Sequence, residues 1–147
     1  MLIKSYKDLL KKHEYLPLEK WKSGKVEHHI EKIKNHRKPP QRERILEQGK
    51  GIPGVYAYFL EDVCLYVGEA GDIGERLAKH YDEAWGDHSN WKKQHHQYEF
   101  FKLYRYELDV KWLELENEFD RKAIEAMCTR IFNPIYIDFR KGLLTKS

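Results

Sequence analysis

The chain has 147 residues, which fits one domain and is long enough to bury a hydrophobic core. Lys and Arg number 27 and Asp and Glu number 24, so the net charge is +3. This balance hides an asymmetry, because residues 1–50 carry 14 basic and 7 acidic side chains, whereas residues 51–147 are net acidic. A basic arm beside an acidic body is typical of proteins that bind polyanions.

Several classes of protein are excluded by composition. No apolar run approaches the roughly 18 residues of a membrane span. The first residues lack the apolar segment of a secretion signal, and Cys64 and Cys128 lie in apolar surroundings that favour buried, reduced thiols. We therefore expect a cytoplasmic protein without a membrane partner. The content of 14% aromatic and 41% hydrophobic residues argues against disorder.

Residues 1–50 are predicted to form a helical N-terminal extension. Val26, Ile30 and Ile33 repeat at helical spacing and indicate an amphipathic helix. A Pro-Pro pair then ends this helix and opens a second one over residues 41–48. The glycine-rich turn that follows is the predicted boundary to a second domain, residues 51–147.

The second domain is predicted to begin with a tight β-hairpin. Residues 55–60 and 63–67 are rich in β-branched and aromatic side chains, and the two polar residues Glu61 and Asp62 separate them. Asp72 is suited to cap a helix that runs to Tyr81.

The rest of the chain is predicted to add one strand and one long helix. The third strand is expected over residues 100–108, after a polar loop at residues 82–97. Apolar residues at spacings of three and four from Trp112 to Ile131 predict the helix, which Asn133 and the following proline would end. The predicted fold is α/β of the α+β kind, a small, mainly antiparallel three-stranded sheet flanked by helices.

Four side chains in this domain suit phosphodiester hydrolysis. Tyr56 and Tyr66 lie at equivalent ends of the hairpin, Arg76 lies on the next helix and Glu125 on the last one. A guanidinium matches phosphate geometry and offsets developing charge. A carboxylate can hold Mg²⁺ or Mn²⁺, and a phenol near a cation can position or activate water.

The spacing of these residues resembles that of the GIY-YIG endonucleases. The signatures are Gly54-Val55-Tyr56 and Tyr66-Val67-Gly68, with nine residues between the two tyrosines. Arg76 follows eight residues after the second signature, His80 four residues later, and Glu125 precedes a late proline. The resemblance covers about residues 51–137.

The resemblance implies a role for each matched residue. Glu125 would hold one divalent metal ion, and Arg76 would contact the scissile phosphate. Tyr56 would activate or orient the water, with His80 assisting through a hydrogen bond or as a proton shuttle. Tyr66 would shape the site and contact phosphate or metal-bound water. Which tyrosine acts as the base is left open by the sequence.

Two positions depart from the family's pattern. Glu69 stands where many members have a non-acidic residue, and it would repel phosphate, serve as a second metal ligand or point to solvent. Ile137 stands where many members have asparagine, and Asn133 fits better as a helix C-cap.

Each site residue also has a plainer structural interpretation. A hairpin tyrosine usually packs in the core, and Arg76 or His80 can have a purely structural role. Glu125 can pair with Arg121 one helical turn earlier.

Basic and aromatic residues outside the motifs form a further candidate nucleic-acid surface. Cations meet phosphates and aromatic rings stack on bases, so we expect contributions from Lys32, Lys34, Arg37, Trp91, Lys92 and Lys93. The tryptophan can instead pin its loop to the core, and the basic helices can be a packing extension.

The sequence therefore predicts a metal-dependent endonuclease that hydrolyses DNA with Mg²⁺ or Mn²⁺. A stand-alone restriction, phage or mobile-element enzyme is the expected type. A single hydrolytic centre would need a homodimer, or two encounters, to cut both strands. The alternatives are a nucleic-acid-binding module that has lost the chemistry and a nuclease that acts on RNA.

Overall fold

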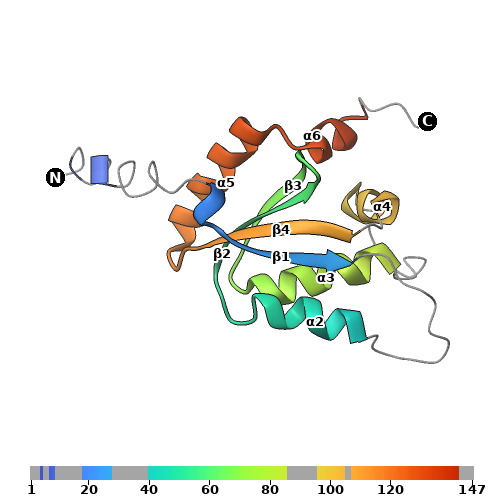
Figure 1. The fold of residues 1–147 in the computed structure, drawn as a ribbon. Coiled ribbons are helices and arrows are strands. Elements are labelled where there is room, and N and C mark those ends of the chain that lie inside the picture. Colours follow the sequence, from blue (N-terminus) through green and yellow to red (C-terminus); the bar gives the residue numbers. More distant parts are fainter. Residues whose placement is uncertain are drawn as a thin grey trace.

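The computed structural model describes residues 18–27, 40–85, 96–104 and 107–142, together with residues 4, 7 and 8. Its centre is a four-stranded sheet in the order β1-β4-β2-β3, with antiparallel pairing throughout (Figure 1). The strands are β1 (Lys22–Glu27), β2 (Gly54–Leu60), β3 (Val63–Ala70) and β4 (Glu107–Glu114). The helical elements are η1 (Leu18–Lys20), α2 (Pro40–Gln48), α3 (Ile73–Trp85), α4 (His96–Leu103), α5 (Glu118–Phe132) and α6 (Ile135–Arg140). The predicted fold class is confirmed, with one strand more than expected.

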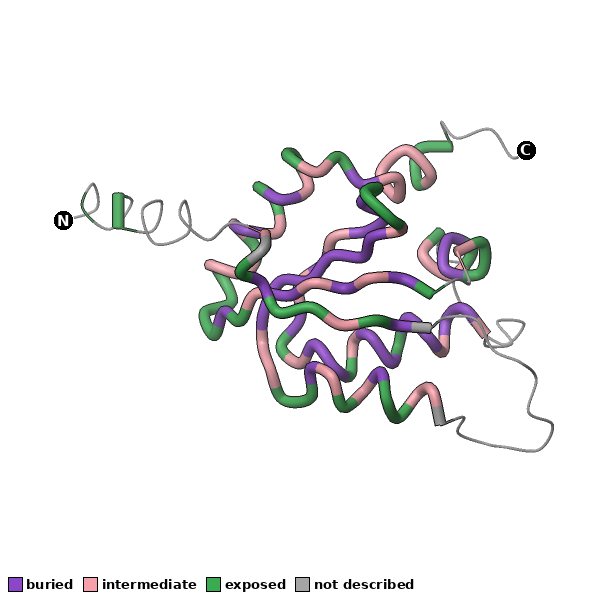
Figure 2. The backbone as a smooth tube through the Cα atoms, in the orientation of Figure 1, coloured by how far each residue is buried: buried purple, intermediate pink, exposed green. Residues whose placement is uncertain are grey.

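Helices cover both faces of the sheet, and the buried residues follow the strands between them (Figure 2). On one face α2, α3, α4 and α6 pack on an aromatic core that includes Tyr56, Tyr58 and Tyr66. On the other face α5 packs on Val55, Ala57 and neighbouring residues. This alternation follows from the pleat of β2, which sends successive side chains to opposite faces. Strand β3 is at the edge of the sheet, so the helical layers on the two faces of the sheet come together beside it.

The predicted hairpin is confirmed. Tyr56 lies opposite Gly68 and Tyr58 opposite Tyr66, and the turn passes through Glu61, whose φ is 55°. Asp72 caps α3 by accepting a hydrogen bond from the Glu75 amide at 3.0 Å. These features depend on local sequence, which is why the motif between residues 54 and 81 was predictable.

The first strand corrects the prediction of a helix that includes Val26. In the structure Val26 is buried and lies opposite Leu108 in the β1–β4 ladder. Ile30 and Ile33, the other residues of the expected helical stripe, lie outside the described residues. Pairing with a distant strand overrides the short apolar pattern here.

The helix expected at residues 41–48 is present as α2 and packs against α3. The division of the chain into an N-terminal extension, residues 1–50, and a second domain, residues 51–147, stays a prediction.

The strand expected over residues 100–108 is wrong. Phe100 and Phe101 lie on helix α4, and both are fully buried in the aromatic core. The strand begins later, as β4, and buries alternate side chains. The long helix accordingly begins at Glu118 rather than Trp112, and Asn117 caps it.

Other expectations concern the thiols and the membrane. Cys64 and Cys128 are free and buried, as predicted. Within the part of the chain that the structure describes, no helix has the length and apolar character that crossing a membrane requires.

Candidate active site

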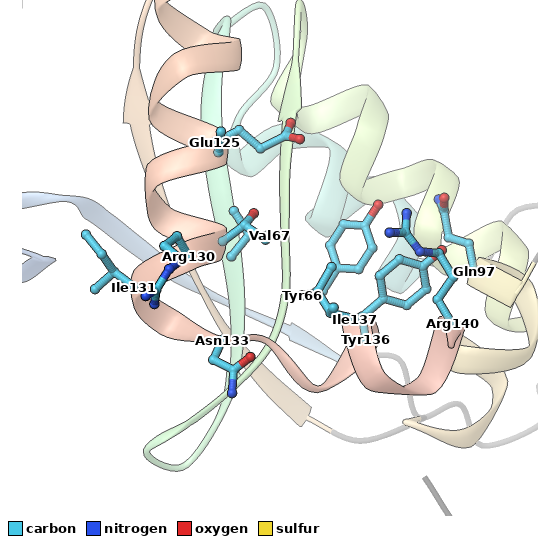
Figure 3. A pocket seen from close by; sticks show the side chains of 12 residues that line it. Tyr66, Val67, Gln97, Glu125, Arg130, Ile131, Asn133, Tyr136, Ile137 and Arg140 are labelled. Carbon is cyan, nitrogen blue, oxygen red and sulfur yellow. The ribbon is translucent and has the colours of Figure 1, made fainter. Parts of the chain in front are cut away.

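The candidate site lies at the edge strand β3, where the two layers of the molecule meet. A pocket of about 920 Å³ opens there and includes Tyr66 of β3 and Glu125 of α5 in its wall. Figure 3 shows the Glu125 side chain reaching across β3 toward the side on which the Tyr66 ring lies. Polar and charged residues of the wall include Gln97, Thr129, Arg130, Asn133 and Arg140, and apolar residues such as Val67 and Ile137 complete it.

Tyr56 and His80 form a short hydrogen bond within the core. The distance between Tyr56 Oη and His80 Nε2 is 2.6 Å, and both residues are completely buried. Tyr66 is 9% exposed, and its ring lies 5.1 Å from that of His80. Tyr66 therefore faces the pocket, and Tyr56 lies behind it.

Gly68 makes room for the hydroxyl of Tyr56. A Cβ atom at this position would lie 2.5 Å from Tyr56 Oη, closer than real side chains approach. Gly68 lies inside β3, directly opposite Tyr56. The missing side chain lets the phenol extend over the edge strand, which connects the two tyrosine signatures.

Arg76 brings a positive charge to this edge. Its guanidinium donates to the carbonyl oxygen of Glu69 at 3.4 Å, and the side chain is partly exposed. Its charge acts on Tyr56, Tyr66 and Glu125, and on His80. The five residues matched by sequence thus lie close to one another, although they come from four elements.

The buried groups have shifted pKa values. Desolvation raises the pKa of Tyr56 well above its usual value, and the neighbouring tyrosines add to the shift, whereas the charge of Arg76 opposes it. Desolvation likewise raises the pKa of Tyr66. The pKa of His80 is lowered by desolvation, against the effect of its hydrogen bond with Glu83. At neutral pH the phenols are therefore protonated and the imidazole is uncharged.

Glu83 and Gln97 are two residues of this network that sequence reasoning missed. Glu83 Oε2 lies 3.1 Å from His80 Nδ1, and Gln97 Nε2 donates to both carboxylate oxygens of Glu83 at 3.1 and 3.0 Å. Glu83 is fully buried. Its position three residues after His80 on one helix was a usable signal. Gln97 comes from a separate helix and gave none.

Glu125 is a candidate ligand for a divalent cation. Its carboxylate is half-buried and forms no ion pair among the described residues. Desolvation raises its pKa, and the charge of Glu69 adds to this effect. No cluster of three or more His, Cys, Asp or Glu residues able to hold a metal occurs in the described ranges. A single carboxylate fits Mg²⁺, which keeps several waters and is often held by one or two carboxylates with substrate phosphates.

Glu69 has an ion-pair partner in the structure. Arg121 Nε lies 3.1 Å from Glu69 Oε2, and Arg121 also donates to the carbonyl oxygens of Leu115 and Glu116. Arg121 therefore pairs with Glu69 and not with Glu125, the partner suggested by its position one turn earlier. Glu69 is neither directed freely to solvent nor an uncompensated negative charge at the site.

Asn133 has the structural role suggested by sequence. It ends α5 in the left-handed conformation, with φ 47°, and its amide donates to the carbonyl oxygen of Thr129. Its side chain also lines the pocket. The expected nucleic-acid contacts of Lys32, Lys34, Arg37, Trp91, Lys92 and Lys93 lie outside the described residues.

Comparison with known proteins gives matches only at the level of structure. No protein-family model and no curated protein sequence matches the chain. The GIY-YIG N-terminal endonuclease domain of UvrC from Thermotoga maritima, bound to its catalytic divalent cation magnesium, has a TM-score of 0.48 at 18% identity, covering 67% of this chain and 97% of that one. A tyrosine-to-phenylalanine mutant of the same domain gives 0.49 at 17% identity, with the same coverage of both chains. A functional assignment consequently depends on the residues of the site.

Proposed function

We propose that the protein is a metal-dependent endonuclease that hydrolyses phosphodiester bonds of DNA. The observation that carries the proposal is the meeting of a guanidinium, two phenols, an imidazole and a carboxylate at one sheet edge beside a polar pocket. An apolar core would not need this set of groups, because buried polar and charged groups are costly unless they are paired.

Glu125 is proposed as the residue that holds a divalent cation, Mg²⁺ or Mn²⁺. The carboxylate faces a pocket and has no competing ion pair among the described residues, which fits a cation that shares its remaining positions with water and phosphate oxygens. When bound, the cation supplies Lewis acidity at the phosphate.

Arg76 is proposed to bind the scissile phosphate. It is partly exposed, and among the described residues its guanidinium forms one hydrogen bond, a long contact of 3.4 Å. Its other donors are therefore proposed to bind a phosphate oxygen. Tyr66, which lines the pocket, is proposed to contact the same phosphate or a metal-bound water. Tyr56 is proposed to activate the attacking water, with its own proton directed to His80.

The charge of the pocket favours a polyanionic substrate. Arg130 and Arg140 stand in the same wall as Glu125, together with the hydrogen-bonding side chains of Thr129 and Asn133. These groups suit the backbone of a nucleic-acid strand on one side of the cleaved bond. A stand-alone enzyme of restriction, phage or mobile-element type, acting as a homodimer on double-stranded DNA, is the proposed biological form.

Plasmid relaxation in the presence of Mg²⁺ tests the proposal. We expect wild-type protein to nick supercoiled plasmid, with Glu125→Ala and Arg76→Ala each slower by about 10²-fold or more, as for the removal of one group that stabilises developing charge. Glu118→Ala, which removes an exposed carboxylate of the same helix, and Arg44→Ala, which removes an exposed arginine of α2, are the matched controls.

The same assay separates the alternatives. Equal nicking by wild type and both site variants would show that the site is wrongly assigned. Binding of plasmid without nicking would support a binding module, and cleavage of labelled RNA but not DNA would support an RNA nuclease. Light scattering with and without DNA tests the dimer, which a strict monomer making clean double-strand breaks would contradict.

A further inference from the structure

Four buried or half-buried side chains form a continuous hydrogen-bond chain behind the candidate site. It runs from Tyr56 through His80 to Glu83, with Gln97 at the far end. The contacts measure 2.6 Å at the phenol and 3.1 Å at the carboxylate, and Tyr56, His80 and Glu83 are all completely covered. The chain joins β2, α3 and α4, so three elements must pack correctly to assemble it.

The partners of His80 determine where its proton lies. A carboxylate accepts hydrogen bonds, so Glu83 requires the proton of the uncharged imidazole to be on Nδ1. Nε2 is then an acceptor, and the hydroxyl of Tyr56 donates to it. The amide of Gln97 lies 3.1 Å from Nδ1 as well, but its hydrogens satisfy the carboxylate oxygens. Glu83 therefore directs the hydroxyl proton of Tyr56 toward His80 and leaves the lone pairs of the phenol oxygen for another partner.

Burying the carboxylate of Glu83 costs desolvation free energy, and the need to fill space in the core does not explain why a carboxylate is present there. Among the described residues Glu83 forms no ion pair with Lys or Arg, and its side chain hydrogen-bonds to His80 and Gln97. An apolar side chain of similar size would fill the same space without the cost of desolvating a charge. A buried titratable group next to a polar pocket is a feature of functional sites.

We propose that Glu83 is a positioning residue of the hydrolytic reaction, fixing the Nδ1–H tautomer of His80 and stabilising the imidazolium that forms when His80 takes the proton of Tyr56. The inference deepens the proposed function and rests on it. As the reaction proceeds, the attacking water loses a proton to the oxygen of Tyr56, and the Oη–H bond of Tyr56 breaks as that proton moves to Nε2. The water oxygen forms the new bond to phosphorus, the bond to the leaving oxygen breaks, and solvent then protonates the leaving group and receives the proton of His80.

The surroundings of His80 make Glu83 necessary for this transfer. Desolvation by α3, α4 and the sheet lowers the pKa of the imidazole, and Arg76 and Lys79 of α3 act in the same direction. The phenols of Tyr56 and Tyr66 face the ring from the sheet. Only Glu83 acts to raise the pKa of His80, through its hydrogen bond and its charge. Without Glu83 the buried imidazole would be a poor acceptor for the phenol proton.

Gln97 has a separate part in this arrangement. It lies in the wall of the pocket and donates to both oxygens of Glu83. It therefore stands between the carboxylate and the pocket and occupies the lone pairs that a cation or water would otherwise use. This contact keeps Glu83 committed to His80 and leaves Glu125 as the carboxylate that faces the pocket.

Nitrogen-15 NMR of the histidine rings in the full chain tests the tautomer directly. We expect the His80 signal, assigned by its loss in His80→Gln, to show protonated Nδ1 and unprotonated Nε2 at neutral pH. The Nε2–H tautomer in wild-type protein would overturn the proposal. This measurement needs no substrate, so it stands whether or not the protein cleaves plasmid and whether or not any Glu83 variant folds.

Plasmid relaxation with Glu83→Gln then tests the role in the reaction. The amide oxygen can still accept from Nδ1–H, so we expect an unchanged tautomer and unchanged KM but kcat lower by about 10²-fold, within the range for general acid–base catalysis. Glu75→Gln, which removes an exposed carboxylate of the same helix, should retain wild-type kcat. Wild-type kcat in Glu83→Gln would refute the inference while leaving the proposed function intact, and absence of nicking by wild-type protein would refute the proposed function.

Discussion

The two faces of the sheet provide different halves of the candidate site. On the face covered by α3 and α4, the groups are buried and already hydrogen-bonded, as in the contact of Tyr56 with His80. On the side of α5, Glu125 is half-buried, without an ion pair among the described residues, and faces a pocket. The difference indicates that the two sides have different functions in the proposed reaction. We call the face covered by α3 and α4 the closed face and the side of α5 the open side. The closed face fixes proton positions before a substrate arrives, whereas the open side keeps charges available for a cation and a phosphate.

The largest decrease in activity is expected when one hydroxyl group is removed from the closed face. Tyr56→Phe deletes the atom that contacts His80 and, by our proposal, the acceptor for the water proton. We expect kcat for plasmid nicking to fall by about 10²-fold or more, in line with the loss of a positioned general base. Tyr58→Phe makes the same change on the same face of β2 and should cost much less. Similar rates for the two variants would break the distinction between the tyrosines.

A methyl group at Gly68 should disturb the closed face at its edge. The added Cβ would come within 2.5 Å of Tyr56 Oη, and the buried ring has little room to move. We expect Gly68→Ala to lower the free energy of unfolding by about 1–3 kcal/mol, the usual cost of overpacking, and to lower nicking as well. Gly71→Ala is the control, because no atom lies within 4 Å of its Cβ position. Urea unfolding of both variants measures the difference, and equal stability would contradict the close contact.

The sequence was sufficient for the parts of this architecture that local chemistry determines. The hairpin, the Asp72 cap and the left-handed Asn133 at the end of α5 all follow from residue types at short spacing. The resemblance also selected the five residues that lie together at the edge of β3, although their roles stay predictions.

The remaining features depend on distant parts of the chain. Strand β1 exists because it pairs with β4, about 80 residues later, and no local pattern records that pairing. Phe100 and Phe101 have the composition of a strand, but both are buried on a helix. Gln97 reaches Glu83 only because α4 packs against α3. Contacts of this kind arise from tertiary packing, so sequence spacing did not predict them.

His80 in the closed face should make the stability of the folded protein decrease at acidic pH. The pKa of His80 is lowered in the folded protein, mainly by desolvation, whereas an unfolded histidine has a pKa of about 6.5. Below that pH the unfolded chain therefore binds a proton that the folded protein does not, and stability decreases as pH falls. The contribution of one group has a slope of at most about 1.4 kcal/mol per pH unit.

Urea unfolding between pH 7 and pH 5 measures this contribution. The informative quantity is the slope of the free energy of unfolding against pH, not its absolute value. His80→Gln should be less stable than wild type at pH 7, yet its stability should fall less steeply with acid. The shift of Glu125 has the opposite sign and is present in both proteins, so it cancels in the comparison. Parallel slopes for the two proteins would mean that folding does not change the pKa of His80.

The smallest effect is expected on the open side, from Glu69. Its charge contributes to the raised pKa of Glu125, while Arg121 offsets that charge through the 3.1 Å ion pair. Glu69→Gln should lower the pKa of Glu125 and change the Mg²⁺ concentration at half-maximal nicking by only about twofold to threefold, because partly exposed ion pairs contribute about 0–1 kcal/mol. The direction is informative: a lower Mg²⁺ requirement means that Glu69 acts only by repelling negative charge, whereas a requirement raised tenfold would make Glu69 a second ligand. That second result would move the open side from one carboxylate to two and would require Arg121 to release its partner when the cation binds.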